Sequence, residues 1–107
     1  MEQQYRLEGK KLIVYMPREL DHHVAQTLCV KLDTLIEVYG VKELEFDFSD
    51  TEFMDSSGIG LVMGRYKLIK SLGGEIRVEN LSPSAYKIMH LAGMERLGEI
   101  RQKETVQ

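Results

Sequence analysis

The sequence predicts a single α/β domain over residues 1–107, with a mixed, mostly parallel sheet of about four or five strands and about three or four helices packed on it. Segments in which apolar residues alternate with polar ones are interleaved along the chain with segments whose apolar residues recur every three or four positions. Helical segments between strands favour right-handed crossovers and therefore parallel pairing. The length of 107 residues with 43% hydrophobic residues suits one core.

The first strands are expected at residues 5–7 and 11–16 and pair antiparallel at one edge of the sheet. Pro17 ends the second strand because proline cannot donate a ladder hydrogen bond. Asp21 is a good N-cap for the first helix, and Gly40 closes that helix. The predicted apolar stripe of this helix contains Ala25, Leu28, Cys29, Leu32, Leu35, Ile36 and Tyr39.

The central strand is expected at residues 43–48, with apolar residues on one side and Glu45 and Asp47 on the other. The second helix starts at Ser56 or Ser57 and reaches about residue 72. One stripe of this helix contains Ile59, Val62, Met63, Tyr66 and Ile69, whereas Leu61, Leu68 and Leu72 lie beside it. A helix that is apolar on more than one side buries both sides or presents one of them to a partner.

The last third of the chain predicts a strand at 75–78, a helix and a short final strand at 97–100. Ser82 followed by Pro83 is a typical helix start, and this helix reaches about residue 91. Residues from about 101 onward are expected to form a polar tail.

Composition excludes several classes of function. The net charge of −3 without a Lys/Arg cluster argues against nucleic-acid binding. The apolar runs are too short to span a membrane, and the N-terminus lacks the features of a signal peptide. Cys29 is the only cysteine and cannot form an internal disulfide. Together these observations predict a cytoplasmic protein that binds neither nucleic acid nor membrane.

The most informative segment runs from Phe53 to Gly60 and contains Asp55-Ser56-Ser57 at the expected start of the second helix. A helix N-terminus exposes unpaired N–H groups and carries a partial positive charge. Asp55 already supplies a capping carboxylate, so the two hydroxyls are surplus to capping. Glycines 58 and 60 in the first turn cost up to about 1 kcal/mol each relative to alanine. An approaching protein surface, or a phosphate added to a serine, would explain these residues.

Catalytic and metal sites are not predicted. Neither Ser56 nor Ser57 fits the G-x-S-x-G pattern of a serine nucleophile. The glycines lack the last position of G-x-G-x-x-G. His22 and His23 are adjacent, so they point about 100° apart on a helix and are poor joint ligands. We therefore expect a protein that is not an enzyme and needs no cofactor. A small serine hydrolase or nucleotide-binding enzyme is the weaker alternative.

The chain resembles the STAS-domain anti-sigma factor antagonists, and among them the sporulation antagonists that control sigma-F. The resemblance covers about residues 7–100 and departs from the family at Pro17-Arg18, where a glycine is usual. The segments that carry it are Glu19-Leu20-Asp21-His22-His23, Phe53-Met54-Asp55-Ser56-Ser57-Gly58-Ile59-Gly60, Gly64-Arg65-Tyr66-Lys67-Leu68-Ile69-Lys70 and Gly73-Gly74-Glu75.

The resemblance implies a STAS-like fold and a partner switch. The unphosphorylated antagonist would bind an anti-sigma factor, which is also a serine kinase using ATP, and so release the sigma factor. That kinase would phosphorylate Ser56, and a PP2C-type phosphatase would reverse the reaction. The expected partner-binding residues are Glu19, Asp21, His22, Asp55, Ser57, Gly58, Ile59, Gly60 and Leu61. A STAS module of a general-stress switch or of a signalling scaffold shares these features and stays open as an alternative.

Overall fold

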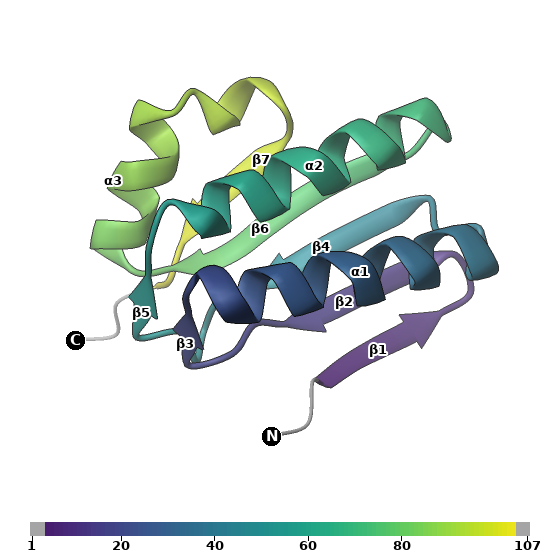
Figure 1. The fold of residues 1–107 in the computed structure, drawn as a ribbon. Helices are drawn as coiled ribbons and strands as arrows, with labels where there is room; N and C mark the ends of the chain where they lie inside the picture. The colour runs from purple at the N-terminus through teal and green to yellow at the C-terminus, as the bar shows by residue number, and fades with distance from the viewer. Residues whose placement is uncertain (1–3, 105–107) are drawn as a thin grey trace.

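The computed structural model describes residues 4–104, which form a five-stranded sheet and helices packed against it (Figure 1). The strand order is β1-β2-β4-β6-β7; β1 is antiparallel to β2, and the other neighbours are parallel. These strands are β1 (Gln4–Glu8), β2 (Lys11–Tyr15), β4 (Glu43–Asp47), β6 (Glu75–Leu81) and β7 (Glu99–Gln102). The helices are α1 (His22–Tyr39), α2 (Ser57–Ser71), α3 (Pro83–Leu91) and the short 3-10 helix η1 (Met94–Arg96). The predicted fold class is thus confirmed.

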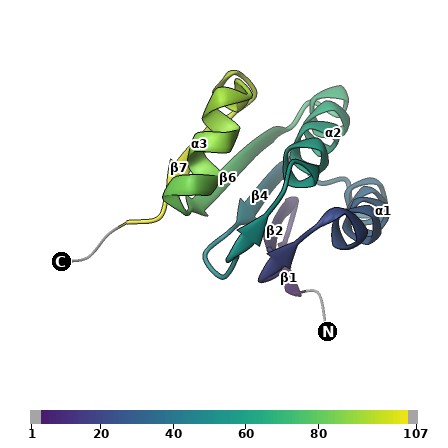
Figure 2. The same ribbon diagram turned by 60° about the vertical axis from the view of Figure 1, so that its left-hand side comes forward.

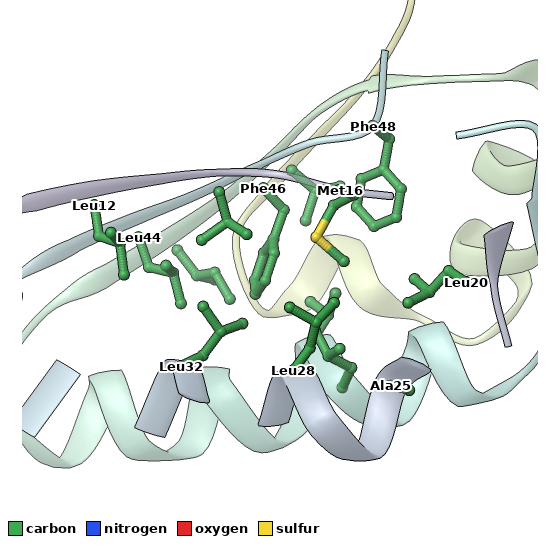
Figure 3. Packing of buried hydrophobic residues seen from close by; sticks show 14 of the residues in the cluster. Leu12, Met16, Leu20, Ala25, Leu28, Leu32, Leu44, Phe46 and Phe48 are labelled. Carbon is green, nitrogen blue, oxygen red and sulfur yellow. The ribbon is translucent and has the colours of Figure 1, made fainter. Parts of the chain in front are cut away.

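The core lies between the sheet and the helices. Alternate residues of each strand point to the same face of the sheet, and the helices cover the face on which the apolar residues lie. Figures 1 and 2 show α1 and α2 side by side over the sheet. In Figure 3, Leu28 and Leu32 of α1 point toward the strands. Neighbouring strands align their buried residues in two rows, which are Leu12, Leu44 and Ile76, then Val14, Phe46 and Val78. Buried residues of α3 and η1 join the same cluster.

Helix α1 has the ends that the sequence predicts. The Asp21 carboxylate accepts a hydrogen bond of 3.0 Å from the Val24 N–H. Gly40 adopts φ 60°, and its N–H donates to the Ile36 carbonyl. Left-handed backbone of this kind is readily adopted by glycine, so the helix stops there. The stripe is correct over its first three turns, but Tyr39 at the last turn is exposed.

Helix α2 buries part of the predicted stripe together with the side next to it. Val62 and Ile69 of the stripe are buried. Leu61, off that stripe, is 1% exposed, whereas Ile59, Met63 and Tyr66 are only half-buried. The reason is that α1 packs along the flank of α2. The Arg65 guanidinium, 12% exposed, lies 2.8 Å from the Asp33 carboxylate of α1. The helix therefore buries the sheet-facing side together with the side that faces α1.

Several element boundaries differ from the prediction. Strand β6 continues to Leu81 through an irregularity in its pairing with β7, and Asn80 there has φ 61°. Strand β7 covers residues 99–102, so the expected tail at 101 begins inside it; residues 105–107 and the N-terminal residues 1–3 lie outside the described part. Within residues 4–104, no helix combines the length and apolar character needed to cross a bilayer.

The sequence analysis did not predict the short strands β3 (Glu19–Leu20) and β5 (Phe53–Met54). They pair parallel with each other as a separate two-stranded sheet. A strand of two residues is too short to show an alternating pattern, so β3 and β5 could not be predicted from periodicity. This small ribbon positions the candidate site.

Candidate functional site

The Ser56 hydroxyl is exposed at the start of α2 and takes no part in capping that helix. Asp55 provides the cap instead: its Oδ1 accepts a hydrogen bond of 2.8 Å from the Ser57 N–H. Ser56 occupies the N-cap position with φ −63° and ψ −14°, and its side chain makes no capping hydrogen bond. Its carbonyl accepts from the Ile59 N–H at 3.1 Å. The hydroxyl is therefore available for chemistry or for contact with another molecule, while the backbone beneath it is held in the helix.

The β3–β5 ribbon brings the start of α1 beside the start of α2 (Figure 1). Glu19 pairs with Phe53 and Leu20 with Met54. The Asp55 N–H donates to the Leu20 carbonyl at 3.3 Å, and the Glu52 N–H donates to the Arg18 carbonyl at 2.8 Å. The two segments that the sequence analysis named as partner-binding thus lie side by side in the fold.

The combined surface is rich in carboxylates. Glu19, Asp21 and Asp55 come from the two paired segments and their helix starts. Glu52 precedes β5 and forms an ion pair of 3.0 Å with Arg18. Two helix N-termini contribute partial positive charge at the same place. The Asp21 and Asp55 carboxylates already accept hydrogen bonds from backbone N–H groups at these two helix starts. An anion added at Ser56 would therefore lie among negatively charged side chains.

Glycines 58 and 60, for which the sequence predicts a shared role, have different environments. A Cβ at Gly58 would lie 2.5 Å from the Met54 Sδ and 3.2 Å from a Leu20 methyl, so this glycine is needed to pack α2 on the ribbon. A Cβ at Gly60 would meet nothing within 4 Å. Packing among the described residues explains why a glycine occupies position 58. The fold does not require a glycine at position 60.

The remaining predicted contact residues divide by exposure. His22 is exposed at the first turn of α1, with its ring 6.1 Å from that of His23. Ser57 and Ile59 are half-buried at the start of α2. The Leu61 side chain is buried in the core, so it cannot contact a partner directly, and we leave it out of the contact surface. Sequence periodicity could have indicated this only if the packing of α1 against α2 had been known.

An additional candidate is Phe53, which the sequence analysis did not select as a contact residue. Its side chain is 52% exposed although its strand neighbour Met54 packs against the core. The available signal was an aromatic residue next to Asp55-Ser56 in a strand too short to be predicted.

The profile of the STAS domain family matches residues 1–106. The chain belongs to the STAS family. This STAS domain is 33% identical over 93 residues to the anti-sigma F factor antagonist of Paenibacillus polymyxa, covering 87% of this chain and 80% of that protein. It is 32% identical over 85 residues to the anti-sigma-B factor antagonist of Bacillus subtilis, covering 79% and 76%.

Solved structures of the anti-sigma factor antagonist SpoIIAA share the fold. Its unphosphorylated form matches with a TM-score of 0.85 at 28% identity, covering 96% of this chain and 90% of that chain. The phosphorylated form of Bacillus SpoIIAA matches with a TM-score of 0.78 at 28% identity, covering 96% and 93%. The STAS domain therefore belongs with a family of regulatory antagonists.

Proposed function

We propose that this STAS domain antagonises an anti-sigma factor by binding it through the surface around Ser56. The observation that carries the proposal is the exposed Ser56 hydroxyl, which the fold leaves free because Asp55 caps α2 in its place. The relatives named as anti-sigma factor antagonists support the same role. The contact residues are Glu19, Asp21, His22, Asp55, Ser57, Ile59 and Gly60, with Gly58 shaping the turn.

Phosphorylation of Ser56 would switch binding off without unfolding the domain. A phosphate adds about −1.5 to −2 charge at neutral pH. The helix N-terminus tolerates an anion, so the fold should persist. The partner surface, however, would meet added bulk and charge beside Asp55, and an unpaired interfacial charge costs several kcal/mol. About 4 kcal/mol corresponds to roughly a thousandfold in affinity.

In this scheme the STAS domain is a substrate and a ligand, and is not itself an enzyme. The anti-sigma factor acts as the serine kinase with ATP, and a PP2C-type phosphatase removes the phosphate. The cytoplasm is the expected location. The partner is either the sigma-F type or the sigma-B type of anti-sigma factor, because the identities to the two classes of antagonist are 33% and 32%. The sporulation motifs at Leu20–His23 and Gly64–Lys70 lead us to favour the sigma-F type.

Equilibrium binding to each purified anti-sigma factor in the presence of ADP tests the proposal. Wild type and Ser56→Ala should bind one of the two, and Ser56→Asp should bind that one at least about a hundredfold more weakly. Ser71→Asp is the matched control for an added carboxylate, because Ser71 is exposed at the opposite end of α2, outside the contact residues, and this variant should bind like wild type. Equal binding by wild type and Ser56→Asp, with matching far-UV circular dichroism, would contradict the switch.

A further inference from the structure

A small pocket lies beside the Ser56 surface, between β5 and α3. Phe53 of β5 and Ile88 of α3 line it together with the buried residues Phe48 and Ala85. Phe53 and Ile88 are 52% and 37% exposed, so their apolar surface reaches solvent at the rim. The ribbon holds Phe53 in place, because its N–H donates to the Arg18 carbonyl at 3.1 Å.

The apolar surface continues from this pocket along α3. Ile88 and Leu91 are three residues apart and therefore lie on the same side of the helix. Leu91 is 75% exposed, the highest value among the large hydrophobic residues of the described chain. The other exposed residues of this class, Tyr5, Val30, Val38 and Tyr39, lie on β1 and α1. Phe53 and Ile88 line the same pocket, and Leu91 extends their apolar surface to the end of α3; we name these three residues the β5–α3 patch.

The residues around Ser56 are too small and polar to account for stable binding alone. A stable protein–protein interface buries about 800 Å² on each partner. Most of its energy comes from a few desolvated apolar or aromatic anchors. The contact surface offers serines, a glycine, carboxylates and the exposed His22, with Ile59 half-buried. An interface of ordinary size centred on Ser56 therefore needs apolar surface beyond these residues, and the β5–α3 patch offers such surface at the adjoining pocket.

Resting on the function proposed above, we propose that the β5–α3 patch is the apolar anchor site for the anti-sigma factor. The charges on its border define the partner chemistry. Glu52, the charged residue among the described residues that line the pocket, already forms an ion pair of 3.0 Å with Arg18. The carboxylates outside that ion pair are Glu19, which pairs with Phe53 on the neighbouring strand, and Asp55, which follows β5. The occupant is an apolar side chain of the anti-sigma factor flanked by lysine or arginine, which complement these carboxylates.

Anchor and switch have separate roles in this arrangement. The β5–α3 patch supplies affinity through burial of apolar surface, and the Ser56 hydroxyl decides whether the rest of the surface can close against the partner. Phosphorylation leaves Phe53, Ile88 and Leu91 unchanged in this view. Substitutions in the patch should weaken binding regardless of phosphorylation, whereas Ser56→Asp removes the tight state.

Equilibrium binding of the full chain to the purified anti-sigma factor with ADP tests this inference. Phe53→Ala and Leu91→Ser should each weaken binding about tenfold or more. Leu91→Ser keeps the test valid if Phe53→Ala fails to fold, because the Leu91 side chain is largely in solvent. Val38→Ala is the matched control: Val38 is 69% exposed on α1, and its truncation should leave binding unchanged.

The outcomes separate the two proposals. If wild type binds, Ser56→Asp does not, and folded Phe53→Ala and Leu91→Ser bind within about twofold of wild type, the anchor inference is wrong while the proposed function stands. If wild type binds neither anti-sigma factor, the proposed function fails and the anchor inference with it. Sedimentation of the free protein gives the remaining outcome: a wild-type dimer that Leu91→Ser dissociates would assign the patch to self-association and overturn the inference.

Discussion

Replacement of Gly60 by alanine should stabilise the fold and weaken partner binding at the same time. Gly60 lies in the first turn of α2, and an added Cβ would meet nothing within 4 Å. Alanine is favoured over glycine in a helix interior by about 1 kcal/mol. For a domain near this size, that gain raises the melting temperature by roughly 4–8 °C.

The unfavourable effect of Gly60→Ala should appear only in the complex with the anti-sigma factor. If the anti-sigma factor contacts the backbone at Gly60, the new methyl group enters a packed interface, where overpacking costs about 1–3 kcal/mol. Affinity should then fall by roughly 5–150-fold. Gly64→Ala is the matched control, because a Cβ there also meets nothing within 4 Å and Gly64 is outside the proposed contact residues. It should stabilise equally and leave binding unchanged.

Gly58→Ala, in the same turn of α2, should change the stability of the fold in the opposite direction. Its Cβ would collide with Met54 and press on Leu20, so the helix-propensity gain is offset and a net loss of stability is expected. Thermal unfolding of the three variants, with titration against the anti-sigma factor, measures both effects. Destabilisation by Gly60→Ala, or unchanged affinity of the stabilised variant, would show that this glycine is not kept for the partner.

Three further predictions concern the site and the core. Asp21→Asn should weaken binding without changing the melting temperature, because asparagine retains the N-cap but removes the charge; an unchanged affinity in the same titration would remove the Asp21 charge from the interface. Leu61→Ala should lower the free energy of unfolding by about 2–5 kcal/mol in denaturant titrations while the folded fraction binds normally, and weakened binding by fully folded protein would return Leu61 to the interface. Burial raises the pKa of the Glu79 carboxyl above its ordinary value of 4.5, although Arg101 acts to lower it. The native state therefore binds the proton more tightly than the unfolded state. The contribution of Glu79 to the free energy of unfolding falls as the pH rises from the pKa of the unfolded state through the higher pKa of the folded state. Glu79→Gln should stabilise more at pH 7 than at pH 4, and a variant less stable than wild type at pH 7 would exclude this cause.

The periodic elements could be predicted from the sequence because each carries its own pattern. Alternation in Leu44, Phe46 and Phe48 indicated the central strand. Asp21 and Gly40 indicated the two ends of α1. These signals are local, since capping and amphipathic patterns depend on residues within a few positions.

Whether α2 buries both of its apolar sides, and the existence of the β3–β5 ribbon, could not be predicted, because both depend on contacts between distant segments. Leu61 is buried since α1 packs beside α2, where Arg65 meets Asp33. The ribbon exists because Leu20 and Met54 are brought together by the rest of the fold. The candidate site was therefore predicted as two separate motifs, and its continuity is a finding of the structure.

The identity of the phosphorylated residue decides whether Ser56 is the switch of this STAS domain. The purified protein is incubated with ATP and the anti-sigma factor kinase, and the added phosphate is mapped by peptide mass spectrometry, with Ser56→Ala as the control. We expect phosphate on Ser56 in wild type and none in Ser56→Ala. Phosphate on Ser57, or unchanged phosphorylation of Ser56→Ala by a kinase that binds the protein, would contradict it.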